Sequence, residues 1–328
     1  MRYKNNGKIC LALILFLIVF AVDSHSYRLN VESMDEFSVG GHIFKTIFWN
    51  DFVFVGNFSN SIKVFQKGDV NFKNQVYINE ISVNDFLVRN DYLFLISEFE
   101  GLFVYKIQTK GRTIELETIF QFPDVSSPLK NIFIKDNLLF ITTKFCEIYI
   151  FELSQKNKLE ITLLNVKYLD DATSIMDLLF LNENDVFVAD ASKGVLYFTL
   201  ENKDLKYKKL FSFHEGATKL YENNSVVYVG NRGGIYLTEF VNKKELKILN
   251  MVPISTYVTD LVVDGDRLYY TGEQEIGILN IANQKSVYTL LSEDLGCFAM
   301  DVNLVSKNEI LVSAFCAGLK RLKLKEVQ

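Results

Sequence analysis

Residues that break secondary structure or carry out catalysis are scarce in this chain. Its 328 residues include only three prolines, too few for a proline-rich linker between domains. There are three histidines, and the GxSxG, HExxH and CxxC motifs of common hydrolases and redox proteins are absent. No window of useful length combines a 3.6-residue apolar period with helix caps. These absences disfavour a helical fold and leave no recognisable catalytic constellation.

Apolar and aromatic residues are abundant instead. Hydrophobic residues make up 49 % of the chain and aromatic residues 14 %, with 28 Phe and 16 Tyr. This composition forms a core readily and favours strands over helices. The length suits one large domain or two ordinary ones.

The first 26 residues have the features of a secretory signal peptide. Three basic residues precede an apolar run at residues 9–22, and Ser24 and Ser26 occupy the −3 and −1 positions of a cut before Tyr27. The alternative is a retained signal anchor, although the run is shorter than the roughly 20 residues that span a bilayer. No second segment is apolar enough to span. We therefore predict a secreted or surface-exposed protein, with a signal-anchored membrane protein as the alternative.

The charge balance argues against nucleic acid as a partner. Removal of residues 1–26 leaves 32 basic and 39 acidic residues, a net charge of −7. Proteins that bind nucleic acid usually present a basic surface to the phosphate backbone.

A turn followed by a strong strand recurs seven times along the chain. One residue of each turn serves as a marker, and successive markers are 39 to 48 residues apart. The markers are Asp51, Asp91, Asn137, Asp185, Asn224, Asp266 and Glu309. A period in the low forties is typical of propeller blades.

Each repeat contains signals for four strands. An apolar strand leads to the turn, the most apolar strand follows it, a third opens near a glycine such as Gly101 or Gly277, and a more polar strand ends the unit. A blade packed between two neighbours requires this gradient from an apolar inside to a polar outside. The pattern predicts an all-β protein, a seven-bladed β-propeller of four-stranded antiparallel blades in a single domain over residues 27–328.

The two ends of the chain predict how the ring closes. The last repeat supplies only three strands, whereas residues 27–31 precede the first repeat and have no place in it. We expect this N-terminal segment to pair as the outer strand of blade seven, which removes exposed sheet edges. The alternative is a free N-terminal arm.

The repeats resemble the LVIVD-type repeat family across the whole mature chain. In the fourth unit, Asp177-Leu178 is followed by Val-Phe-Val-Ala-Asp at residues 186–190 and then by Gly194-Val195. The resemblance implies a propeller that is often secreted or surface-associated and has no shared catalytic activity. The terminal Asp of that family's repeat is missing here. The Trp-Asp pairs of WD40 repeats are also absent, since the only tryptophan, Trp49, precedes Asn50.

Five repeats carry a carboxylate or amide at the start of the inner strand. These residues are Asp85, Asn131, Asp177, Asp260 and Asp301. One interpretation is a Ca²⁺ or ligand site at the rim of the central channel, because hard cations take several oxygen ligands. The other is that each side chain accepts backbone N–H groups and pins strand to strand. The same role repeated from blade to blade favours the second interpretation, so we expect no cofactor.

The cysteines and two glycosylation sequons bear on the compartment. Cys297 and Cys316 flank one predicted hairpin and face each other across it, which suits a disulfide in an oxidising compartment; two buried thiols are the alternative. Cys146 has no predicted partner and is free, buried or available to another chain. Asn57 and Asn223 head Asn-x-Ser sequons at predicted turns, where a glycan is tolerated.

The loops between the second and third strands hold the candidate contact residues. They carry aromatic and charged side chains, and exposed aromatics among charges mark interfaces. These residues are Phe58, Glu98, Phe99, Lys144, Phe145, Lys193, Arg232, Glu273 and Phe315. We therefore predict a non-catalytic binding or scaffold module for a protein or glycan. The alternative is a metal-assisted hydrolase or lyase that uses the acidic residues at the channel rim.

Overall fold

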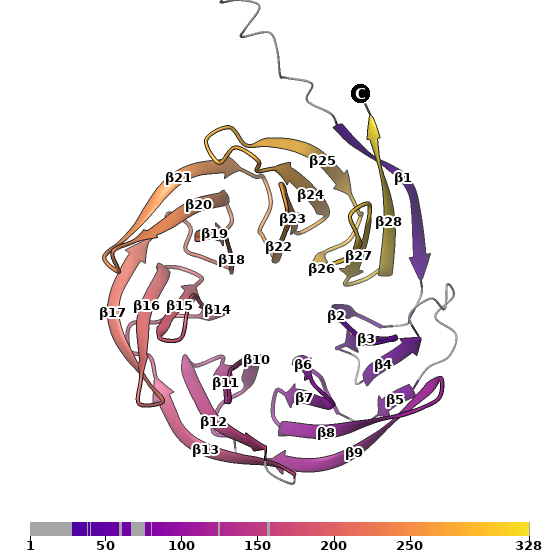
Figure 1. Cartoon of the computed structure of the whole chain (residues 1–328), viewed down its shortest axis with the longest axis vertical. Coiled ribbons are helices and arrows are strands. Elements are labelled where there is room, and N and C mark those ends of the chain that lie inside the picture. The colour runs from indigo at the N-terminus through magenta and orange to yellow at the C-terminus, as the bar shows by residue number, and fades with distance from the viewer. Residues whose placement is uncertain are drawn as a thin grey trace, which may run out of the picture.

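Seven antiparallel sheets of four strands each surround a central axis in the computed structural model (Figure 1). The structure describes residues 28–37, 39, 41–58, 61–66, 76–79, 81–123, 125–155 and 158–327. Every regular element in these ranges is a strand, and none is a helix long and apolar enough to cross a membrane. The predicted all-β seven-bladed propeller is confirmed. The predicted signal peptide lies outside the described residues.

The strands of the first four blades follow the chain in order from the inside outward. Blade 1 contains β2 (Ile43–Trp49), β3 (Phe52–Asn57), β4 (Ser61–Gln66) and β5 (Val76–Asn79). Blade 2 contains β6 (Asp85–Arg89), β7 (Tyr92–Ser97), β8 (Gly101–Lys110) and β9 (Thr113–Phe122). Blade 3 contains β10 (Leu129–Lys135), β11 (Leu138–Thr143), β12 (Glu147–Gln155) and β13 (Leu159–Tyr168). Blade 4 contains β14 (Ile175–Phe180), β15 (Asp185–Asp190), β16 (Gly194–Glu201) and β17 (Asp204–Ser212).

The last three blades keep this order, except that the outer strand of blade 7 comes from the N-terminus. Blade 5 contains β18 (Lys219–Asn223), β19 (Val226–Gly230), β20 (Gly234–Val241) and β21 (Glu245–Pro253). Blade 6 contains β22 (Asp260–Asp264), β23 (Arg267–Thr271), β24 (Glu275–Asn280) and β25 (Tyr288–Asp294). Blade 7 contains β26 (Ala299–Ser306), β27 (Glu309–Ala314), β28 (Gly318–Val327) and β1 (Arg28–Phe37).

The turn residues explain why the first hairpin of each blade is so regular. Asn50, Asn90, Asp136 and Asn224 adopt positive φ angles between 50° and 53°. Asn and Asp tolerate this left-handed conformation, and two-residue hairpins require it to match the twist of their strands. The repeated turn signal in the sequence is therefore a backbone requirement.

Glycine at the start of the third strand answers a different requirement. At Gly101, φ is 96°, and a Cβ atom would lie 1.9 Å from the carbonyl oxygen of Phe122 on the outer strand. In blade 6 the third strand starts at Glu275 instead, two residues before the predicted Gly277. The ring of Tyr270 lies over Gly277, where a Cβ atom would fall 2.0 Å from Cζ.

The hydrophobic core is divided among the seven interfaces between neighbouring blades. One buried cluster fills each interface, and no single core lies at the centre of the ring. Between blades 1 and 2, for example, Phe54, Phe86 and Leu95 are fully buried. Every described residue of β3, β11 and β15 is buried. The second strands therefore face neighbours on both sides, as their continuous apolar runs predicted.

Pairing of the chain ends closes the ring, as predicted. β1 runs antiparallel to β28, from Arg28 opposite Val327 to Phe37 opposite Leu319. Leu29 is 2 % exposed and packs with Tyr269 and Leu322 between blades 6 and 7. Every blade thus gains a neighbour on each side.

The two ends of the ring differ in which loops they carry. We call the end where the inner strands begin the upper rim. The loops between the second and third strands also return there, and they bond the connections between blades: Leu129 N donates to Glu98 O at 3.0 Å, and Lys144 N donates to Pro128 O at 2.9 Å. The predicted contact loops therefore share one rim with the starts of the inner strands.

We predict that Leu29→Ala lowers the free energy of unfolding by about 2–4 kcal/mol, because it opens a cavity at the closure interface. The neighbouring Asn30→Ala, at an exposed position of the same strand, serves as the control and is expected to change stability by less than about 0.5 kcal/mol. Urea unfolding followed by fluorescence measures both. Equal stabilities for the two variants would contradict closure of the ring by β1.

Candidate functional site

Seven equivalent positions at the start of the inner strands line the central channel. Each occupies the same place in its blade, facing the end of the second strand. In blade order these ring positions are Lys45, Asp85, Asn131, Asp177, Lys219, Asp260 and Asp301. The five polar residues singled out in the sequence thus do come together. The two lysines were missed, although Lys45 precedes its turn marker by the same six residues as Asp85.

Each ring carboxylate accepts a hydrogen bond from the inner strand of the next blade. Asp85 Oδ2 accepts from Ile132 N at 3.0 Å, and Asp177 Oδ2 accepts from Leu220 N at 3.0 Å. Asp260 Oδ2 accepts from the backbone N of blade 7 at Val302, at 3.1 Å. These bonds pin blade to blade, and their donors belong to the neighbouring strand rather than to an adjacent loop.

Asn131 and Asp301 continue the same chain of contacts. Asn131 Nδ2 donates to Met176 O in blade 4 at 3.0 Å. Asp301 Oδ2 accepts from Thr46 N at 2.9 Å and from Thr46 Oγ1 at 3.1 Å, which joins blade 7 to blade 1. The amide of Asn303 donates to the same oxygen at 2.6 Å. Asp301, near the C-terminus, therefore holds β2, the inner strand of blade 1, in place.

The two ring lysines form ion pairs with three of the four ring carboxylates. Lys45 Nζ lies 2.7 Å from Asp85 Oδ1. Lys219 Nζ lies between two acids, 3.2 Å from Asp260 Oδ1 and 3.6 Å from Asp177 Oδ2. Burial by itself would lower the pKa of Lys219, but the surrounding carboxylates of Asp177, Asp260 and Asp301 raise that pKa above its ordinary value. Lys219 is therefore held in its charged form at neutral pH.

Asp301 has a strongly raised pKa. Burial raises its pKa to about 7, and the nearby charge of Asp260 adds to the shift. Burial also raises the pKa of Asp177, against the opposing effect of Lys219. Asp301 thus exchanges a proton near neutral pH while it holds the joint between blades 7 and 1.

A metal would have to displace these contacts. Among the described residues, no group of three or more His, Cys, Asp or Glu side chains is arranged to hold a metal ion. The ring oxygens accept backbone N–H groups and lysines, so Ca²⁺ at the channel rim stays an untested prediction.

The predicted contact residues fall into separate groups on the upper rim. Phe99 and Phe145 are 71 % and 61 % exposed, and they lie in the adjacent loops of blades 2 and 3. An ion pair between Glu98 and Lys144 joins these two loops. In blade 4, Lys193 Nζ donates to Asp171 O at 2.6 Å.

The remaining predicted residues lie elsewhere on the rim. Arg232, exposed in blade 5, lies over the ring of Tyr257 at 5.6 Å. Glu273 is exposed in blade 6, with its backbone N donating to Thr256 Oγ1 at 2.7 Å. Blades 5 and 6 do not adjoin blades 2 and 3, so neither Arg232 nor Glu273 lies next to Phe99 and Phe145.

Phe58 and Phe315 correct the expectation that all rim aromatics face a partner. Both are half-buried at the joint between blades 7 and 1. Phe315 stacks on His42 with ring centroids 4.4 Å apart, and Phe58 packs on Phe44 at 4.5 Å. Their rings contribute to closure because the neighbouring blade covers them.

Sequence reasoning missed an apolar extension of the Phe99 and Phe145 surface. Leu163, Val166 and Tyr168 on the outer strand of blade 3 are 37 %, 41 % and 58 % exposed. They lie opposite Phe151, Tyr149 and Glu147 of the third strand, so by register they share the face that turns toward blade 2. The sequence did contain a signal for this extension, because the outer strand of blade 3, which was assigned to the polar strands of the repeat, contains several apolar residues.

The cysteines are arranged as one bridge and one buried thiol. Cys297 and Cys316 form the predicted disulfide, with Cα atoms 5.9 Å apart, between the connection into blade 7 and its upper loop. Cys146 is free and 4 % exposed, and burial raises the pKa of its thiol. It is therefore not available to another chain.

The two candidate glycosylation sites differ in access. Asn57 is 3 % exposed, and its Oδ1 accepts from His42 N at 3.1 Å, so its burial argues against a glycan there. Ser59 of that sequon lies outside the described residues. Asn223 borders an exposed turn at residues 224–225 and remains the predicted acceptor.

The comparisons with known proteins show the fold. No family model matches the chain, and no curated protein matches it. The crystal structure of RRP9 WD40 repeats has a TM-score of 0.68 at 8 % identity, over 91 % of this chain and 98 % of that chain. The computationally designed Ika8 protein has a TM-score of 0.61 at 12 % identity, over 88 % of this chain and 98 % of that chain. The LVIVD resemblance stays a prediction.

We predict that Lys219→Met destabilises the protein by about 3–5 kcal/mol at pH 8, because it leaves Asp177 and Asp260 buried without a counter-charge. The loss shrinks as the pH falls, because the raised pKa of Asp177 lets that carboxyl group take up a proton. Lys206→Met is the matched control, since Lys206 forms an ion pair with Asp204 on the exposed outer strand of blade 4 and its loss costs less than about 1 kcal/mol. Similar losses for both variants in urea unfolding would refute this role of Lys219.

We predict that Asp301→Asn flattens the pH dependence of stability. The pKa of Asp301 is higher in the folded protein than in the unfolded chain, so its contribution is largest in acid and is lost as pH rises from about 4 through about 7. The variant should exceed the native protein in melting temperature at pH 8.5 and lose that advantage at pH 5. A parallel shift at both values would show that Asp301 does not titrate in this range.

Proposed function

We propose that this protein is a non-catalytic binding module that docks a protein partner on the upper rim of blades 2 and 3. The observation that carries the proposal is the exposure of Phe99 and Phe145. They are the two most exposed large apolar side chains in the described part of the chain. A large aromatic held in water at a loop tip gains apolar contact when a partner covers it, and such residues dominate binding energies.

The loops that carry these rings are held in place before binding. Thr143 Oγ1 accepts the backbone N of Phe145 at 3.2 Å and that of Glu147 at 3.1 Å. The Glu98–Lys144 ion pair and the backbone bonds to the blade connection add further restraint. The loops therefore lose little conformational entropy on association, and this preorganisation favours affinity.

The surface has the composition of an interface. Phe99, Phe145 and Tyr168 form its aromatic part, Leu163 and Val166 extend it down the outer wall, and the Glu98–Lys144 pair lies among them. Interfaces combine an aromatic centre with a charged rim in this way. A glycan is less suited, since its many hydroxyl groups would lose hydrogen bonds to water against phenylalanine rings.

We propose that the module acts in the secretory pathway or outside the cell. The signal-like residues 1–26 and the Cys297–Cys316 disulfide support an oxidising compartment. No observation favours the alternative of a hydrolase or lyase, because the ring acids are occupied by backbone donors and lysines.

The double variant Phe99→Ser/Phe145→Ser tests the proposal. It should lose about 100-fold or more in affinity for the partner, from about 2 kcal/mol or more per hot-spot aromatic, with an unchanged melting temperature. Crosslinking and affinity capture from the native source, with quantitative mass spectrometry, identifies proteins that the native chain retains and the variant loses. Calorimetry with the purified candidate then measures affinity.

Ile248→Ser is the matched control, because Ile248 is 52 % exposed on the outer strand of blade 5, away from the proposed surface. It should bind as the native chain does. Identical captured sets for all three chains would contradict the proposal. Binding to immobilised glycans that only the double variant loses would assign the surface to a glycan instead.

A further inference from the structure

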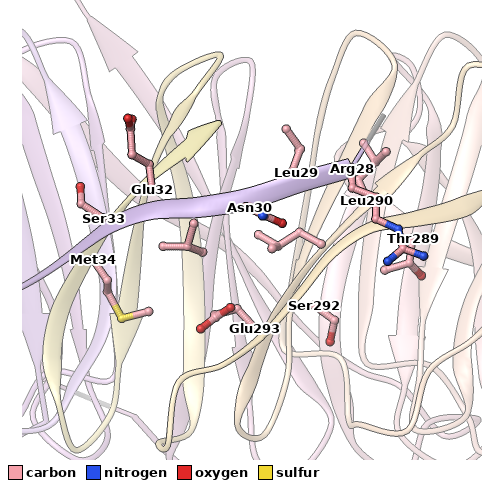
Figure 2. Close-up of a pocket in the computed structure, with 12 residues that line it drawn as sticks. Arg28, Leu29, Asn30, Glu32, Ser33, Met34, Thr289, Leu290, Ser292 and Glu293 are labelled. Atoms are coloured by element: carbon pink, nitrogen blue, oxygen red, sulfur yellow. The ribbon is translucent and has the colours of Figure 1, made fainter. Parts of the chain in front are cut away.

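A groove of about 720 Å³ runs between the outer strands of blades 6 and 7 (Figure 2). Residues 28–34 of β1 form one wall and residues 289–293 of β25 form the other. It lies on the outer wall of the propeller, and blade 1 separates it from the surface of blades 2 and 3 on the shorter way around the ring (Figure 1). It is independent of the proposed function.

Both walls of the groove are open strand edges. Within the described part of the chain, β1 pairs only with β28, and β25 pairs only with β24. The side chains of successive residues in a strand point to opposite faces of its sheet. Consecutive residues can therefore line one groove only if the groove runs along the edge of the strand. Backbone N–H and C=O groups on that side of β1 are thus available to pair with an added strand.

The dimensions suit a short extended segment. Seven residues of β1 extend over about 20–23 Å at the rise of a strand, the length of a segment of six or seven residues. β1 and β25 both run from the lower to the upper rim, since each is the outermost member of an antiparallel four-stranded blade. A strand that is antiparallel to β1 in this groove is therefore also antiparallel to β25.

The side chains of the groove specify the chemistry of the segment. Leu29, Leu290 and Leu291 are buried and form an apolar floor. Glu32 and Glu293 lie along the groove, with Arg28 at its lower end (Figure 2). Among the described residues, none of these three charged side chains forms an ion pair. Their charges are therefore free to engage a ligand.

We propose that this groove binds an extended peptide segment of a partner protein, which adds to the free edge of β1 as an antiparallel strand. Antiparallel pairing is the more stable arrangement. Alternate apolar side chains of the segment cover the leucine floor, and a basic residue in its N-terminal half pairs with Glu32 and Glu293. An acidic residue or carboxylate at its C-terminal end lies beside Arg28. Main-chain bonds supply affinity, and the charges set direction and specificity.

A random heptapeptide library displayed on phage tests this with the full propeller as target. We expect enrichment of sequences with alternating apolar residues, a basic residue in the first half and an acidic residue in the last. The synthetic peptide should bind at least 10-fold more weakly to Glu32→Lys/Glu293→Lys. A peptide with its basic residue changed to Glu should recover binding to that variant. Glu160→Lys/Glu245→Lys, on the exposed outer strands of blades 3 and 5, is the control and should bind normally.

Methylation of alternate peptide nitrogens separates strand addition from side-chain contact alone. We expect methylation of the nitrogens that face β1 to abolish binding. Three results would overturn the proposal: no enriched motif, a motif that Glu32→Lys/Glu293→Lys selects equally well, or undiminished binding of the methylated peptide. Light scattering can give a fourth contrary result. A dimer of the native chain that Glu32→Lys/Glu293→Lys dissociates would identify a second copy of this chain as the occupant of the groove.

Discussion

The hydrogen bond from an inner-strand N–H of one blade to a ring side chain of the preceding blade is the contact on which the propeller depends. It joins four of the seven pairs of neighbouring blades: Ile132 N donates to Asp85, Leu220 N to Asp177 and Val302 N to Asp260, and Thr46 N donates to Asp301 where the ring closes. Each apolar cluster lies between two blades, so no blade buries its faces alone. The contact sets the spacing of the inner strands, and the apolar clusters then fill the space between the sheets.

The same contact also satisfies the buried polar groups of the ring. A carboxylate that accepts backbone N–H groups and faces Lys219 is satisfied, and buried charges are stable only when they are satisfied in this way. The ring is therefore a structural device, and burial raises the pKa of its member Asp301 to about 7. The two proposed binding sites lie at the periphery, where the upper loops of blades 2 and 3 and the edge of β1 are held by the propeller scaffold.

Several features were predictable from the sequence because their causes are local or strictly periodic. Left-handed turn residues recur in the first hairpins of five of the seven blades, the buried second strands recur with each blade, and the disulfide follows from hairpin register. Other features were not predictable. Lys45 and Lys219 differ in type from the acids that share their positions, so a search for one residue type passed over them. Phe58 and Phe99 occupy similar loops, yet only Phe58 packs against a ring of the neighbouring blade, that of Phe315, while Phe99 stays exposed.

The sequence by itself determined the number of blades, the order of strands within them and the origin of the closing strand, because a period of about forty residues and an unpaired N-terminal strand admit few topologies. Only the tertiary structure decided which polar residues meet and which aromatic residues remain in water. Asp301 and Thr46 are 255 residues apart, and Phe145 and Phe315 are similar in their local sequence roles. Burial and pairing arise when the ring closes, so they depend on contacts between blades that no single repeat contains.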